Sequence, residues 1–552
     1  MKRLLLRLER REAVCLTEAW CGEEFLDQTP LEALQHEDGA QCWRVLAALA
    51  EKEAACGAAI AGLLGLAVGD AVGAPLEFLP VEQVLDESDV RRPLVRVEDG
   101  QLSYRHAFNR FRLRPGQWTD DTSMALCLAD SLLVKQGYDG SDLRVRWHMW
   151  WFHGYCNAFR YDEQRHVRSS VGLGGNVAKS LAEVERSAQV AATYDSATND
   201  AGNGSIMRLA PVPIAYHSDL QQAMRYAILQ SRASHPSCDA AACCAFMCFF
   251  QVRAIDLHRR GVAKDVRSFL SEAADGFLHS GFQDLEEFRC MESGREDGIA
   301  RITALLKCQP PSPKEVNWDW KSYEPAIRQA IHARLRDRRY NGHPIIDTYW
   351  GAYCMDGLAV ALWALWHSSS FSQSIMKVVN VLGDADTTGA ICGQLAGTFY
   401  GWKGLSDAWG RMRLSELQQW DPYAEIGLRA ALLFHYGPSQ ATHVQLVQKE
   451  GHAFVRVFDK PDASGKRLVG EVKSGSQAWQ LARDVDFALV VAEASGQCLT
   501  GWVGIKNVVR LSVGPESSQP APKEHSGYPR RSVHAIPGGS SQRSSTTPPA
   551  RR

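Results

Sequence analysis

Two short acidic segments far apart in the chain carry the residues best suited to chemistry. Residues 118–122 read WTDDT, and residues 383–388 read GDADTT. Each segment places two carboxylates and neighbouring hydroxyl groups just before a helix-like apolar stretch. Brought together, they supply hard oxygen ligands, which suit Mg²⁺, Mn²⁺ or Ca²⁺ and suit soft metals poorly. Two such ions sharing carboxylates can orient the hydroxyl groups of a substrate and activate one water.

The alternative interpretation of each segment is a helix N-cap. Asp and Thr are preferred caps, and acidic side chains are stabilised at the positive end of a helix. Capping, however, needs only one side-chain oxygen, whereas two adjacent carboxylates repel one another unless a cation or a donor intervenes. Because the pattern occurs twice, we favour a metal site.

Length and composition set limits on the function. A chain of 552 residues exceeds the usual size of one core, so at least two domains are expected. The net charge of −2 predicts no bulk attraction to nucleic acid or to anionic membranes. The 15 cysteines include no CxxC pair, which is typical of a reducing compartment. We expect the cytoplasm, with the nucleus left open.

An apolar stretch at residues 58–79 has glycines at four-residue spacing. Gly65, Gly69 and Gly73 could form the close-packing face of a membrane helix. Asp70 and Glu77 argue against a membrane span. We therefore predict a buried core helix.

The remaining pattern divides the chain into four parts. Residues 1–54 read as a helical N-terminal extension. Residues 55–438 carry helix-period apolar runs, so an all-α domain is expected, with a charged, proline-containing insertion at 281–347. Residues 439–514 read as five or six short strands that resemble an SH3-like β-barrel. Residues 515–552 are rich in Ser, Pro, Gly and Arg, which is typical of disorder.

Six motifs appear in a fixed order along the all-α part. They are residues 69–77 (GDAVGAPLE), 118–122, 202–208 (GNGSIMR), 234–235 (SH), 351–353 (GAY) and 383–387. This set resembles the ADP-ribosylglycohydrolase family over roughly residues 57–405. The resemblance implies an all-α ADP-ribosylglycohydrolase-like fold with two Mg²⁺ or Mn²⁺ ions at the base of a cleft for ADP-ribose.

The resemblance also assigns the metal and catalytic residues. The metal set is Thr119, Asp120, Asp121, Asp384, Asp386 and Thr387. Asp120 and Asp121 are also predicted to be catalytic, together with Glu77, which matches an acid that the family places beside the metals. For Glu77 the alternative is a solvated side chain at a helix end. Asp70 is interpreted as a group that orients the ligands.

The substrate-binding assignments rest on glycine-rich segments and on two rings. The predicted set is Gly174, Gly175, Asn176, Asn203, Gly204, Ser205, His235 and Tyr353. The glycine-rich segments offer backbone N–H groups to phosphate or ribose, although most such segments are turns. The alternatives are a plain loop position for His235 and a core position for Tyr353.

These observations predict a metal-dependent enzyme that hydrolyses the glycosidic bond between ADP-ribose and a modified protein side chain. A catalytically silent ADP-ribose-binding or crystallin-like protein and a metal-dependent nucleotide phosphohydrolase are the alternatives, and the product distinguishes them. The expected partners are an ADP-ribosylated protein or conjugate and a protein bound by the SH3-like domain, with no nucleic acid and no membrane. The linkage, whether to arginine, to serine or to another group, is not set by the sequence.

Overall fold

The computed structural model describes residues 39–81, 93–98, 101–186, 201–291, 294–337, 339–412, 415–438, 442–448, 453–458, 468–483, 487–494 and 497–510. Residues 1–38 of the predicted N-terminal extension and the whole predicted tail at 515–552 lie outside this part of the chain. The three boundaries between the four predicted parts therefore stay predictions.

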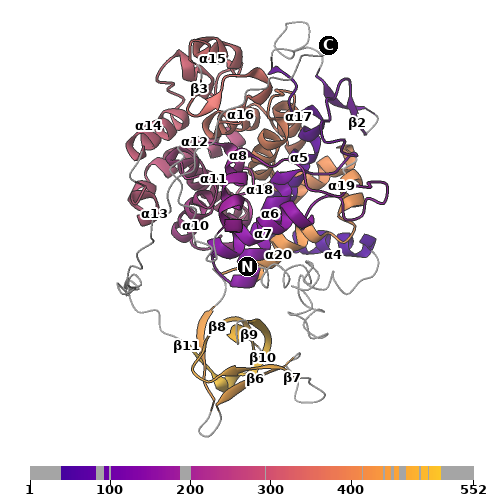
Figure 1. Cartoon of the computed structure of the whole chain (residues 1–552), viewed down its shortest axis with the longest axis vertical. Coiled ribbons are helices and arrows are strands. Elements are labelled where there is room, and N and C mark those ends of the chain that lie inside the picture. The colour runs from indigo at the N-terminus through magenta and orange to yellow at the C-terminus, as the bar shows by residue number, and fades with distance from the viewer. Residues whose placement is uncertain are drawn as a thin grey trace, which may run out of the picture. The chain divides into compact units, whose positions relative to one another are not determined.

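The described chain from residue 39 to residue 438 is mostly helical (Figure 1). Its α-helices are α4 (Gly39–Lys52), α5 (Ala54–Gly73), α6 (Asp120–Lys135), α7 (Gly140–His153), α8 (Gly175–Arg186), α9 (Pro211–Ala215), α10 (Leu220–Arg232), α11 (Cys238–Arg259), α12 (Val266–Leu278), α13 (Glu286–Arg289), α14 (Arg295–Leu306), α15 (Ile327–Arg334), α16 (Cys354–Trp366), α17 (Phe371–Val379), α18 (Ala385–Met412), α19 (Ser415–Trp420) and α20 (Glu425–Tyr436). The apolar runs with helical period fall inside these helices, so the prediction of a helical fold is confirmed.

Helices α5 and α18 cross at a stripe of glycines. A Cβ atom added to Gly69 would overlap the carbonyl of Gly389, and one added to Gly389 would overlap the carbonyl of Gly69. Only glycine lets two helix backbones approach so closely. Asp70 follows Gly69, and Asp386 is the second residue of α18. The crossing therefore sets the separation of these two acids.

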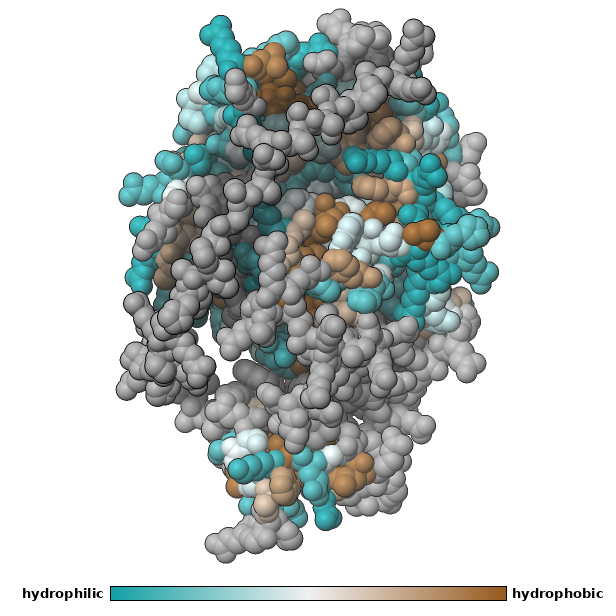
Figure 2. Space-filling view, in the orientation of Figure 1, coloured by the Kyte–Doolittle hydropathy of each residue, from teal (hydrophilic) through white to brown (hydrophobic). Residues whose placement is uncertain are grey.

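Two helical stretches are long and apolar enough to cross a membrane by length and composition, Ala54–Leu76 and Cys238–Arg259. In both, the apolar window is buried inside the protein, by 100% and 89%. On the face shown in Figure 2, the hydrophobic residues lie in separate patches among hydrophilic ones. Burial accounts for the apolar sequence of these helices, as predicted for residues 58–79.

The predicted insertion at 281–347 contains the short helices α13 to α15 and a small hairpin, β3 (Arg339–Tyr340) and β4 (His343–Pro344). A buried ion pair joins this region to α16. The guanidinium of Arg334 donates to both carboxylate oxygens of Asp356, and the indole of Trp318 donates to Asp356 Oδ1 at 3.0 Å. The hairpin lies next to the GAY motif at residues 351–353, because the rings of Tyr340 and His343 each lie 5.8 Å from the ring of Tyr353.

The C-terminal strands form one antiparallel sheet of seven strands in the order β11-β5-β8-β9-β10-β6-β7. They are β5 (Thr442–Leu446), β6 (Phe454–Phe458), β7 (Leu468–Lys473), β8 (Gln477–Arg483), β9 (Phe487–Ala494), β10 (Gln497–Gly504) and β11 (Val508–Arg510). A further pair, β1 (Val95–Glu98) and β2 (Gln101–Tyr104), belongs to the helical part.

The strand count differs from the five or six predicted. The prediction omitted β8, which lacks strict alternation of apolar and polar residues, and β11, which has only three residues. Among the described strands, no pairing joins the edge strands β7 and β11 to close a barrel. The prediction of an SH3-like barrel therefore stays a prediction.

Candidate metal centre and substrate site

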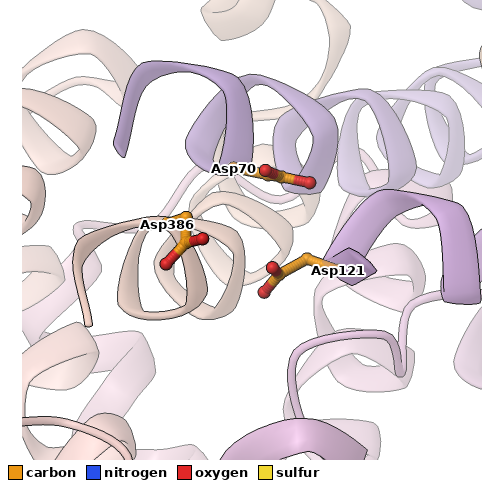
Figure 3. Close-up of side chains that lie close together, drawn as sticks. All are labelled: Asp70, Asp121 and Asp386. Atoms are coloured by element: carbon orange, nitrogen blue, oxygen red, sulfur yellow. The ribbon is translucent and has the colours of Figure 1, made fainter. Parts of the chain in front are cut away.

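Carboxylates from three helices meet at one place (Figure 3). Asp70 comes from α5, Asp121 from the first turn of α6, and Asp386 from the first turn of α18. Oxygens of these three residues lie within 4.8 Å of one another, and oxygens of Glu77, Asp384 and Asp386 form a second group of the same size. Asp386 belongs to both groups, so the arrangement offers two neighbouring places for a cation.

Asp70 fixes the start of α6. The backbone N–H and hydroxyl of Thr119 donate to Asp70 Oδ1 at 3.0 and 2.8 Å, and those of Thr122 donate to Oδ2 at 3.0 and 2.6 Å. The first N–H groups of a helix have no partner within it, so Asp70 supplies their acceptor from another helix. Burial raises the pKa of Asp70 to about 6, while these donors lower it. This geometry suits an orienting group.

The other acids of the centre destabilise one another as anions. Burial raises the pKa of Asp121 well above its ordinary value, and the charges of Asp70 and Asp386 raise it further. Burial is also the main cause of the raised pKa values of Asp120 and Asp386. Asp121 is fully buried, and its Oδ1 has no hydrogen-bond partner among the described residues. The oxygens thus fit hard divalent cations, which would neutralise the cluster.

Glu77 lies beside the second carboxylate group. It follows a turn of 3₁₀-helix (Ala74–Leu76) that continues α5. Only 8% of its surface is exposed, which does not agree with a solvated glutamate, and its Oε2 has no partner among the described residues. Burial, then the charges of Asp386 and Asp384, raise the pKa of Glu77 well above its ordinary value. A carboxyl group in such a setting is a candidate for proton transfer.

Asn203 connects a predicted substrate loop to the second acidic segment. Its Nδ2 donates to Asp384 Oδ2 at 2.6 Å and to the carbonyl of Gly351 at 3.0 Å. Its backbone N–H donates to the carbonyl of Ala352 at 3.0 Å. Burial raises the pKa of Asp384, while the bond from Asn203 lowers it. Asn203 therefore positions Asp384, whereas its contact with substrate stays a prediction.

The segment before α8 passes against the first acidic segment. Gly172 has a φ of +89°, and a Cβ atom there would overlap Asp120 Oδ1, so this position requires glycine. Gly174 and Gly175 are exposed and have open space around them. Since α8 begins at Gly175, its N-terminus offers backbone N–H groups to an anion. Their role toward pyrophosphate stays a prediction.

Three predicted substrate segments converge on the ring of His235. A Cβ atom on Gly204 would lie 2.8 Å from its Cε1, and one on Gly202 would lie 3.2 Å from its Cδ2 and 3.6 Å from Asn176 Nδ2. His235 Nδ1 pairs with the hydroxyl of Ser234 at 2.8 Å. Glycine is favoured at both positions because the backbone packs directly against the imidazole ring and leaves little room for a Cβ atom.

Three other predicted residues are packed inside the protein. Ser205 is fully buried and accepts a hydrogen bond from Ser231 Oγ at 2.8 Å. Tyr353 is 3% exposed, and its hydroxyl donates to Asp239 Oδ2 at 2.8 Å. The hydroxyl of Thr387 lies 3.9 Å from a methionine sulfur. Their contacts with substrate or metal remain predictions.

A cavity of about 460 Å³ lies near the centre but apart from it. Its lining includes Trp118, Arg160, Asp421 and Arg429, and none of the carboxylates of the two groups described above. The indole of Trp118 donates to the carbonyl of Cys156 at 3.1 Å. The cavity is therefore distinct from the candidate metal centre.

The motifs do not predict Phe78, the neighbour of Glu77 in the chain, or Arg110, which contacts Phe78. Phe78 follows Glu77 directly, and the guanidinium of Arg110 lies over the Phe78 ring at 4.8 Å from its centroid. Adjacency to Glu77 is the only signal that points to Phe78. Arg110 belongs to a segment whose place in the site follows from the tertiary structure alone.

Comparison with known proteins agrees with this site. The model of the ADP-ribosylglycohydrolase family matches residues 50–438. A protein from Pseudomonas putida named ADP-ribosylarginine hydrolase is 30% identical over 357 residues, which are 63% of this chain and 71% of that protein. One of the same name from Serratia proteamaculans is 27% identical over 381 residues, covering 68% and 79% of the two chains.

A third relative carries a different name. The ADP-ribosyl-dinitrogen reductase glycohydrolase of Rhodospirillum rubrum is 25% identical over 355 residues, which are 64% of this chain and 88% of that protein. The family match covers more than half of the chain and includes every carboxylate of the two groups. The chain therefore belongs to the ADP-ribosylglycohydrolase family of hydrolytic enzymes.

Proposed function

We propose that the protein hydrolyses the bond between ADP-ribose and an arginine side chain of a protein. The observation that carries the proposal is the pair of carboxylate groups that share Asp386, with Glu77 in one of them. The names of the Pseudomonas and Serratia relatives support the arginine linkage.

The proposed cofactors are two Mg²⁺ or Mn²⁺ ions. The residues proposed to hold them are Thr119, Asp120, Asp121, Asp384, Asp386 and Thr387. When bound, such ions supply Lewis-acid stabilisation of negative charge and lower the pKa of a water.

The protein's own residues would hold the groups and move the proton. The bond between the anomeric carbon and the guanidinium nitrogen breaks, and the oxygen of water bonds to that carbon. Glu77 takes one proton from the water and returns it to the leaving nitrogen, so the products are ADP-ribose and arginine. The buried carboxylates stabilise the positive charge that develops on the ribose. Asn203 and Asp70 keep Asp384 and the start of α6 in place for this step.

Two parts of the proposal rest on the sequence alone. The protein would act in the cytoplasm. Its C-terminal sheet is proposed to be SH3-like and to recruit a protein partner or the modified target.

The test uses peptides that carry ADP-ribose on arginine or on serine, assayed with Mg²⁺, with Mn²⁺ and with EDTA. We expect metal-dependent release of ADP-ribose from the arginine peptide, and its loss in the Asp120→Asn/Asp121→Asn double variant. Release from the serine peptide alone would contradict the arginine linkage. AMP as the product would indicate a phosphohydrolase. No product, with ADP-ribose still binding in calorimetry, would indicate a silent binding protein.

A further inference from the structure

The backbone of Phe78 is locked to the second acidic segment. Its φ is +67°, a left-handed conformation that is costly for an aromatic residue. The Phe78 N–H donates to the carbonyl of Gly383 at 2.9 Å, and the Gly383 N–H donates to the carbonyl of Leu79 at 2.9 Å. These two bonds fix the backbone of Phe78, the residue after Glu77, against Gly383, the residue before Asp384.

Two other rings complete an aromatic rim, which we define as Phe78, Phe111 and Tyr349. The Phe78 ring meets Tyr349 edge-on at a centroid distance of 5.1 Å and Phe111 at 6.2 Å. Phe78 and Phe111 are partly buried, whereas Tyr349 is 41% exposed. The rim therefore presents aromatic surface to solvent within one residue of the candidate proton-transfer group.

The rim already carries a guanidinium. Arg110 is exposed, and its guanidinium carbon lies 4.8 Å from the centroid of the Phe78 ring. The neighbouring Asn109 anchors the segment, because its N–H donates to the carbonyl of Pro75 at 3.1 Å and its side chain bonds both backbone groups of Leu113. The protein itself thus shows that a guanidinium fits this aromatic surface.

We propose that the aromatic rim binds the guanidinium of the ADP-ribosylated arginine, and that Arg110 occupies this place until the substrate displaces it. The inference rests on the proposed function. The substrate guanidinium is bonded directly to the carbon that Glu77 serves, so it must lie within a few ångströms of that carboxyl. A cation over an aromatic face is stabilised by the ring quadrupole, whereas the neutral oxygen of a serine linkage gains nothing there. The rim therefore selects the linkage, while the carboxylates perform the chemistry.

Arg110 has a definite consequence for affinity. A substrate that must displace a bound cation binds more weakly than one that enters an empty place. Removing Arg110 is therefore expected to strengthen binding of the arginine-linked substrate, whereas removing a ring weakens it. A merely structural role for these residues would not produce opposite signs.

The experiment compares one peptide modified on arginine with its counterpart modified on serine, in Mg²⁺. Phe78→Leu is expected to raise KM for the arginine-linked peptide about three- to tenfold and to raise KM for the serine-linked peptide less. Phe78→Tyr keeps the ring and should restore the wild-type value. Arg110→Ala should lower KM for the arginine-linked peptide, while Arg112→Ala, an exposed arginine of the same segment, should not. Equal effects of Phe78→Leu on both peptides would overturn the inference.

A binding measurement separates this inference from the proposed function. Agmatine carries a guanidinium, and N-carbamoylputrescine has a neutral urea of the same shape in its place and the same ammonium group at the other end. In calorimetry the wild-type protein should bind agmatine more tightly than N-carbamoylputrescine. Compared with the wild type, Phe78→Leu should bind agmatine more weakly and Arg110→Ala should bind it more tightly. This result would support the rim even if no peptide were hydrolysed. Equal binding of the two probes, or no change in Phe78→Leu, would refute the rim even if hydrolysis occurred.

Discussion

The carboxylate centre and the aromatic rim meet at adjacent residues, Glu77 and Phe78, but they differ in burial and in secondary structure. Three acids of the centre, Asp70, Asp121 and Asp386, are buried and lie on α5, α6 and α18. The rim is partly exposed, and its residues lie outside the α-helices, Tyr349 being the last residue of a 3₁₀-helix (Asp347–Tyr349). Rigid helices suit a cluster of like charges, because the acids repel one another and would separate if the backbone were flexible. Loop residues suit a surface that must exchange one cation for another.

The largest expected effect comes from the acid shared by both groups. Asp386→Asn removes one charge from each cation site, so we expect activity on arginine- and serine-linked peptides to fall together by more than about 100-fold. Steady-state assays with a titration of Mg²⁺ measure this. If the loss were confined to one linkage, the separation between a chemical centre and a selective rim would be wrong.

A methyl group at the α5–α18 crossing should also damage the centre without touching an acid. Gly69→Ala places its Cβ on the carbonyl of Gly389, which cannot rotate away, so we expect a loss of about 3 kcal/mol in the free energy of unfolding. Activity should fall on both linkages, because the helices that carry Asp70 and Asp386 are pushed apart.

The matched control for this variant is Gly137→Ala. The nearest atom to its added Cβ lies 4.0 Å away. Urea denaturation should show it unchanged or slightly more stable. Similar destabilisation by the two substitutions would remove the steric explanation.

A smaller effect is expected at the support of the second acidic segment. Asn203→Ala deletes the donor to Asp384 and to the carbonyl of Gly351, so we expect a loss of about 10- to 100-fold in activity or in metal affinity. Calorimetric titration with Mn²⁺ measures metal affinity independently of activity and so distinguishes a loss of metal binding from a loss of catalysis. Unchanged metal affinity together with a raised KM for ADP-ribose conjugates would instead favour the predicted role in substrate binding.

The smallest effect concerns pH and metal removal. Burial raises the folded-state pKa of Asp70 to about 6 and those of Asp121 and Asp386 well above their ordinary values. Groups with raised folded pKa values stabilise the protein at low pH, and this stability is lost as pH rises through those values. For Asp70 the window runs from about 4 to about 6.

We therefore expect the Tm of EDTA-treated protein to fall by a few degrees as pH rises from the lower end of this window toward neutrality. Added Mg²⁺ should reduce that fall, because the cations take the place of the protons. Thermal unfolding at several pH values tests this. Rim variants such as Phe78→Leu should show the same pH dependence as the wild type, and a changed dependence would mean that the rim and the centre are not separable.

Local sequence pattern determined the helical fold and the identity of the acids. Apolar residues at helical spacing predict α6, α11 and α18, because each helix must bury one face. The paired acids at 118–122 and 383–388 mark the starts of two helices, and six motifs in order identify the family. The glycine spacing in residues 58–79 predicts a close-packed helix. The weaker strand patterns allowed β8 and β11 to be missed.

Only the tertiary structure shows which of those residues come together and which groups contact them. Asp386 belongs to both carboxylate groups, and it also accepts a hydrogen bond from the hydroxyl of Thr119, which is 267 positions away in the chain. Asp70 accepts the N-terminal donors of α6, and Arg110 lies over Phe78. No periodicity in a sequence encodes such pairs, because they depend on where distant backbones cross. The glycine spacing on α5 is visible in the sequence. That α18 is the helix packed against these glycines is not.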